Sequence, residues 1–180
     1  MPATYEPIAT FTADGSSNPI TFTSIPATYT DLRFVISCRA NQGTGGGGYS
    51  NFTYRYNSSS STLYSSTEII GDGASATSSS NTGATYNVIG SGYSIIGKSD
   101  SPLNLVTLDV LNYAGSTNKT ALATSSTDRN GSGTVVRNVS LWRSTSAITS
   151  VSFDVDAFGG VSGRAFASGS TFTLYGIKNA

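Results

Sequence analysis

The sequence contains no histidine, and only 11% of its residues are charged, with ten basic and ten acidic side chains that cancel to a net charge of zero. Without histidine, the commonest general base and the commonest metal ligand are missing, so neither a Ser-His-Asp nor a Cys-His arrangement can form within the chain. A neutral chain exerts no long-range attraction on a polyanion, so nucleic acid is not an expected partner. We therefore expect a protein that is not an enzyme, with no cofactor and no metal site.

Cysteine is nearly absent as well. The single residue, Cys38, cannot form a disulfide within the chain, and it alternates with Leu32, Phe34 and Ile36, which predicts a buried apolar thiol. The first ten residues, MPATYEPIAT, have neither a basic region nor an apolar run, and no stretch approaches the roughly 18 apolar residues of a membrane helix. We expect no signal peptide, no membrane contact and synthesis in the cytoplasm.

Serine and threonine are the commonest residues, and apolar residues alternate with them at a period of two. This pattern predicts strands, and turn-forming residues separate the segments. We see no sustained helical stripe and no internal repeat. The sequence predicts an all-β, single-domain β-sandwich, jelly-roll-like or another Greek key. The clearest expected strands are 20–24, 32–38, 51–57, 103–113, 135–142, 151–158 and 171–177.

The segment 103–113 is apolar on both of its faces, as a central strand covered on both sides would be. Leu103, Leu105 and Leu111 lie on one face, and Val106, Leu108 and Val110 lie on the other.

One domain is expected, with residues 1–28 as a candidate N-terminal arm that includes the first strands and residues 29–180 as the body. Two loops rich in Ser and Gly, 41–50 and 71–86, interrupt the pattern. The glycine run at 43–48 lacks the following Lys-Ser or Lys-Thr of a phosphate-binding loop. The 71–86 segment is expected to be a flexible loop, with an interaction loop as the alternative.

Asp154 and Asp156 are the only closely spaced acid pair, about 6.6 Å apart on one face of a strand. Such a pair is a candidate for calcium binding or glycoside hydrolysis. Val151, Phe153 and Val155 are expected on the buried face of this strand, so both aspartates are expected on the solvent side.

Aromatic residues offer the best candidates for contacts with a partner, because aromatic rings with a polar tip are enriched at interfaces with proteins and sugars. The alternative is packing within the core and across strands. The candidates are Tyr49, Phe52, Tyr54, Tyr56 and Trp142.

Three stretches together resemble a family of small virion structural proteins of tailed bacteriophages: YEPIATFTADGSSNPITFTSIPATYTDLRFVIS at 5–37, VSLWRSTSAITSVSF at 139–153 and GSTFTLYGIKNA at 169–180. The resemblance implies a virion protein made in the host cytoplasm, which packs against copies of itself, commonly as a homotrimer. It also implies other virion proteins as partners, and it supplies no catalytic residues.

Two functions follow from this resemblance. The first is a capsid-surface decoration or cement subunit that binds the major capsid protein, which the absence of any fibre-shaft repeat favours. The second is a tail-fibre or tail-tip subunit that binds a host surface glycan through the loops 41–50 and 71–86. An enzyme such as a polysaccharide lyase is the least favoured class, because only the aspartate pair offers chemistry.

Overall fold

The computed structural model describes residues 4–41, 49–90, 96–97, 102–128, 133–155 and 164–178. These residues form strands joined by turns, and no helix occurs among them. The strands are β1 (Tyr5–Thr12), β2 (Ile20–Phe22), β3 (Asp31–Cys38), β4 (Tyr49–Ser50), β5 (Phe52–Tyr56), β6 (Tyr64–Gly71), β7 (Ala76–Ala84), β8 (Asn87–Ile89), β9 (Ile96–Gly97), β10 (Asn104–Leu111), β11 (Lys119–Asp128), β12 (Gly133–Trp142), β13 (Val151–Val155) and β14 (Thr171–Ile177).

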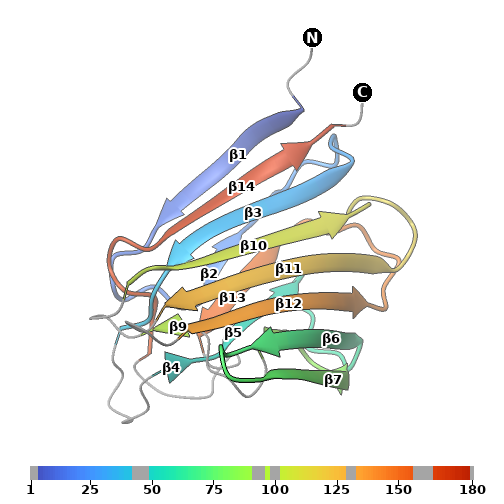
Figure 1. Ribbon diagram of the computed structural model, residues 1–180. Coiled ribbons are helices and arrows are strands. Elements are labelled where there is room, and N and C mark those ends of the chain that lie inside the picture. Colours follow the sequence, from blue (N-terminus) through green and yellow to red (C-terminus); the bar gives the residue numbers. More distant parts are fainter. Residues whose placement is uncertain are drawn as a thin grey trace.

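Two antiparallel sheets form the body. The larger sheet has eight strands in the order β1-β14-β3-β10-β11-β12-β6-β7, and the smaller has four in the order β2-β13-β5-β8. The larger sheet faces the viewer in Figure 1, and the smaller sheet lies behind it. The predicted all-β sandwich is confirmed. The jelly roll is not confirmed, because a jelly roll divides eight strands between two sheets.

The inner face of the larger sheet forms one wall of the core. On β3, Leu32, Phe34, Ile36 and Cys38 are fully buried and alternate with partly exposed residues, as the sequence predicts. Burial raises the pKa of the Cys38 thiol well above its ordinary value, since the core disfavours the thiolate. Cys38 is therefore a small apolar core residue.

Aromatic rings from both sheets fill the space between them. Phe153 of β13 lies 5.0 Å from Phe34 of β3 and 5.8 Å from Phe172 of β14, measured between ring centroids. Its ring also lies 5.6 Å from the ring of Phe52, which is on the adjacent strand β5. Edge-to-face and tilted pairs at these distances add to the gain from burial, so Phe153 links the two sheets.

The solvent-exposed position predicted for Asp154 is wrong. Asp154 is only 2% exposed, and Asp156 lies outside the described residues. Asp154 lies on β13, between β2 and β5. Ser152 on the same strand and Thr53 opposite Asp154 on β5 share its outer side of the smaller sheet, and both are also buried. This part of the smaller sheet is covered on both faces, so alternation along β13 alone does not predict exposure.

Most of the segment 71–86 is the strand β7 (Ala76–Ala84), which corrects the expected flexible loop. After a turn at Asp72, β7 pairs with β6 along the whole edge of the larger sheet. The expected N-terminal arm also contributes strands, because β1 forms the opposite edge of the larger sheet and β2 forms an edge of the smaller one.

Candidate interaction surface

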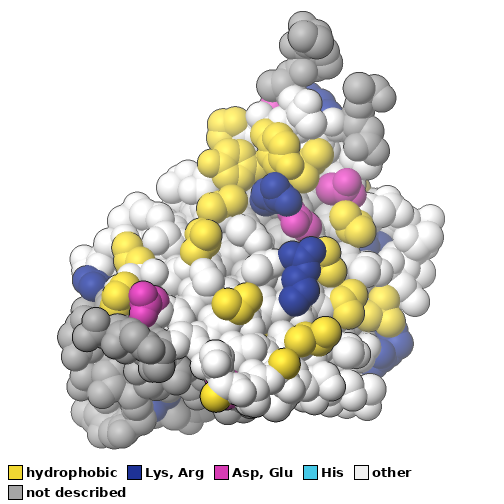
Figure 2. Space-filling view, viewed as in Figure 1, with side chains coloured by type: hydrophobic (Ala, Val, Ile, Leu, Met, Phe, Trp, Pro, Cys, Tyr) yellow, Lys and Arg dark blue, Asp and Glu magenta, His cyan; other side chains and the backbone are white. Residues whose placement is uncertain are grey.

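The outer face of the larger sheet is the most distinctive surface of the molecule. We define this outer face as the outward-pointing side chains of β3, β10, β11, β12 and β6, which alternate with the core residues of the same strands. Val135 is 61% exposed, Ile69 60%, Leu105 50% and Val139 43%. Figure 2 shows yellow side chains scattered among white polar ones over this face.

The outer face of β10 is open, contrary to the prediction that both of its faces are covered. Leu105 and Leu111 are half exposed, and Leu103 just before the strand is 49% exposed, whereas Val106, Leu108 and Val110 are fully buried. β10 is a central strand, as expected, but no second layer of the described residues covers its outer side.

Two arginines on the outer face form hydrogen bonds with side chains on other strands of the larger sheet. The Arg33 guanidinium donates to both carboxylate oxygens of Asp109, with 2.8 Å between Nη2 and Oδ2, and its Nη1 donates to the Tyr5 hydroxyl at 3.1 Å. Hydrogen bonding to Asp109 raises the pKa of Arg33. Arg137 donates to the Thr124 hydroxyl. Asp109 thus compensates the charge of Arg33, whereas Arg137 is hydrogen-bonded to a neutral hydroxyl. Asp31 and Asp128 lie at two ends of the face, and its other side chains are aliphatic or hydroxyl-bearing.

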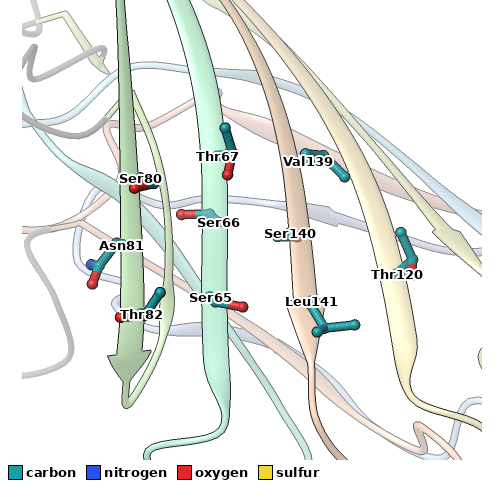
Figure 3. Close-up of a pocket in the computed structure, with 10 residues that line it drawn as sticks. All are labelled: Ser65, Ser66, Thr67, Ser80, Asn81, Thr82, Thr120, Val139, Ser140 and Leu141. Carbon is teal, nitrogen blue, oxygen red and sulfur yellow. The ribbon is translucent and has the colours of Figure 1, made fainter.

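A groove of about 300 Å³ crosses the outer face where β6 and β7 meet β12 and β11. In Figure 3, Ser65 and Thr67 of β6 lie beside Leu141 and Val139 of β12, and Thr120 of β11 lies next along the sheet. A second hollow of about 260 Å³ shares Thr67 and Val139 with the first, so the two adjoin. The groove offers hydroxyl groups beside short aliphatic walls, and it holds no aromatic ring.

A third hollow, of about 420 Å³, lies at the far end of the outer face. Leu103, Leu105 and Val135 line it, together with Ser126 and with Asp128 at the end of β11. This apolar cluster is a natural place for a partner side chain to insert.

The aromatic residues predicted to contact a partner lie mostly in the core. Phe52 and Tyr54 are 0% exposed, Tyr56 is 1% and Trp142 is 3% exposed, so core packing accounts for them. The side chain of Tyr49 lies outside the described residues. Partner contacts are therefore not placed on these four buried side chains.

The buried tyrosines form a small polar network inside the core. Tyr54 and Ser140 of β12 share a hydrogen bond between their hydroxyls, and the Tyr64 hydroxyl accepts from the backbone N–H of Tyr56 at 3.1 Å. Burial raises the pKa of Tyr54 to about 12, and it raises the pKa of Tyr56 well above its ordinary value. These phenols stay neutral at physiological pH, and their rings and hydroxyl groups pack within the core.

The described residues include no group of three or more acidic or cysteine side chains placed to hold a metal ion. Within the same part of the chain, no helix is long and apolar enough to cross a membrane.

The residues of the outer face were not singled out by sequence analysis. The signal was present in 135–142, where Val135, Val139 and Leu141 alternate with Val136 and Trp142, so the strand carries apolar residues on both faces, mixed with polar ones. A strand that is apolar on both sides but open on one side is a candidate for contact with another protein.

The fold and this surface define the class: an all-β sandwich that presents a broad, nearly neutral, half-apolar sheet face. Comparison of the chain with protein-family models, with curated proteins and with solved structures finds no significant match.

Proposed function

We propose that this chain is a non-enzymatic structural protein of a tailed-phage virion and works as a capsid-surface decoration subunit. The observation that carries the proposal is the open outer face, where Leu105, Val135 and Val139 stand exposed among hydroxyl groups. Such a face suits a broad protein contact, because the aliphatic groups supply apolar area while the hydroxyls keep the free protein soluble. The resemblance of three sequence stretches to phage virion proteins supports the setting.

The proposed partner is the major capsid protein, and the proposed assembly is a homotrimer made in the host cytoplasm. A net charge of zero supports contact with a structural partner, because it brings neither attraction to nucleic acid nor strong repulsion between subunits.

The test is binding of the purified protein to undecorated capsids, measured by co-sedimentation. A variant with both Leu105→Asp and Val135→Asp places two charges in the apolar hollow at the end of the outer face, and we expect its affinity to fall at least about tenfold. The control carries Ser116→Asp and Thr145→Asp, which add the same charge at exposed turn positions and should bind as the parent protein does. Unchanged capsid binding by the outer-face variant, or parent protein found only with tails, would contradict the proposal.

The groove in Figure 3 favours a second candidate function, a tail-fibre or tail-tip subunit that binds a host surface glycan. The hydroxyl groups of Ser65, Thr67 and Thr120 are suited to hydrogen bonds with sugar hydroxyls. A glycan array would test it, with a Thr67→Ala and Thr120→Ala variant for comparison. Glycan binding that this variant loses, without capsid binding, would decide for the tail.

A further inference from the structure

The two edges of the larger sheet are built differently. β1, at one edge, carries Pro7, which has no backbone N–H, and its register with β14 shifts between Pro7 and Ala9. An ion pair of 2.9 Å between Glu6 and Lys178 lies beside it. Proline, a bulge and charge are the devices by which proteins block the pairing of an edge strand with another chain.

β7, at the other edge, has none of these devices over most of its length. Its sequence, ATSSSNTGA, contains no charge and no proline, and its pairing with β6 is regular from Ala76 to Thr82. The register shift falls only at Gly83, whose φ is 66°. Pairing with β6 uses one side of β7, and no described strand pairs with the other side.

β7 is also unusual in burying almost nothing. Residues 76–83 are all exposed, on both faces of the strand. The strand is held by its pairing with β6, by a hydrogen bond of 3.0 Å from the Ser79 hydroxyl to the buried Glu68 carboxylate, and by the turn in which Asp72 accepts from the Ser75 N–H at 2.7 Å. A strand kept extended without a buried face is pre-organised to add another strand.

We propose that β7 is a self-association edge, where the β7 strands of two copies of this chain pair antiparallel about a twofold axis at Ser79. Ser79 is the middle residue of the regular stretch Ala76–Thr82. With the axis there, Ser78 of one copy faces Ser80 of the other on the outer side of the sheet. The contact joins the two larger sheets into one continuous sheet.

A second copy fits this edge better than a chain of different chemistry. With no large apolar side chain on β7, affinity comes from backbone hydrogen bonds and from small hydroxyl pairs across the strands. Because β7 carries no charge, two identical β7 strands do not repel each other. A partner strand with charged side chains would meet no opposite charge on β7. The contact does not use the aliphatic hollow of the proposed capsid-binding surface, so either can fail without the other.

Analytical ultracentrifugation of the purified chain tests the contact with two variants of matched size. Ser78→Lys with Ser80→Lys sets lysine against lysine across the axis, and Ser78→Lys with Ser80→Glu sets lysine against glutamate. Both positions are exposed, so neither variant should unfold the protein, and circular dichroism checks this.

We expect β7–β7 pairing to join two copies, or two of the proposed homotrimers, into an even-numbered assembly, in a step that depends on concentration. The lysine–lysine variant should weaken that step at least about tenfold, and the lysine–glutamate variant should recover it to within about threefold. A parent chain that stays monomeric at about 100 µM, an odd-numbered assembly, or equal effects of the two variants would overturn the proposal.

Discussion

The two faces of the larger sheet carry similar residues on the same strands but have different environments. On β10, Val106, Leu108 and Val110 are fully buried, whereas Leu105 and Leu111 are half exposed. The difference comes from the second layer, since the smaller sheet covers one side only. Apolar residues therefore identify a strand face that is suited to contact. The position of the smaller sheet determines whether that face is buried in the core or left open to another molecule.

The largest expected difference between the two faces is in the rate at which a thiol on each face reacts. Cys38 points into the core from β3, and Ser37 beside it points to the outer side. We expect the native protein to react with a chromogenic disulfide reagent at Cys38 at least about 10³-fold more slowly than a Ser37→Cys, Cys38→Ala variant does, because burial excludes the reagent and raises the thiol pKa. In guanidinium chloride the two thiols should react alike. Fast reaction of native Cys38 would show that this end of the core opens.

The next largest difference is expected in the free energy of unfolding that is lost when a side chain on each face is truncated. Phe153→Ala removes a ring packed between the sheets and should lower the free energy of unfolding by about 3–5 kcal/mol, measured in urea. Leu105→Ala removes half as many carbon atoms, from the outer face, and should change the free energy of unfolding by less than about 0.5 kcal/mol. Phe153→Leu, which keeps much of the volume, should fall between them. Equal losses at the two sites would mean that the outer face is covered in the purified protein.

A smaller loss of stability is expected when the buried Glu68 carboxylate, which links several strands by hydrogen bonds, is removed. The Glu68 carboxylate accepts hydrogen bonds from the Gly90 N–H at 2.9 Å and from the Asn138 side-chain amide at 3.1 Å. Glu68→Ala leaves these donors without that acceptor and should cost about 1–3 kcal/mol by thermal or urea unfolding. Ser79→Ala removes only the exposed donor on β7 and should cost less than about 1 kcal/mol. A larger loss for Ser79→Ala would mean that β7 is more tightly integrated than its exposure indicates.

The sequence predicted the strands in which large apolar residues alternate with polar ones, as in β3 and β14. It did not predict β11, although β11 is central in the larger sheet. The inner side of β11 is built from Lys119, Ala121, Ala123 and Ser125, which are all buried. Small residues facing a core of large aromatic rings leave room for those rings, but they give no apolar alternation in the sequence. The Lys119 ammonium reaches back to donate to the Gly115 carbonyl at 2.6 Å.

β7 was missed for a related reason, because a strand that is polar on both faces has no period to detect. The candidate surface was missed for the opposite reason, since β10 and β12 carry apolar residues on both faces and a sequence cannot show which face the second sheet covers. The aromatic candidates show the same limit, because Phe52 and Tyr54 meet residues distant in sequence inside the core.

The smallest expected effect concerns the connection where the chain crosses from the larger sheet to the smaller one, between β1 and β2. There the Asp14 Oδ1 accepts from the Ser16 N–H at 2.8 Å, the Ser16 hydroxyl at 2.9 Å and the Ser17 hydroxyl at 3.0 Å. These bonds, led by that of the Ser16 backbone, lower the pKa of Asp14 from 3.8 to about 2.

Because the folded pKa is below the unfolded one, the carboxylate's contribution to stability is fully present above pH 3.8 and is lost as the pH falls towards 2. An NMR titration should place the Asp14 midpoint near pH 2, and Asp14→Asn should flatten the dependence of stability on pH across that window. Asp72→Asn is the matched comparison, since the pKa of Asp72 is also lowered by backbone N–H groups, in the turn before β7. An Asp14 midpoint near 3.8 would mean that these hydrogen bonds are not formed in solution. The two sheets would then be held together by their shared core, and the turn between β1 and β2 would not stabilise their packing.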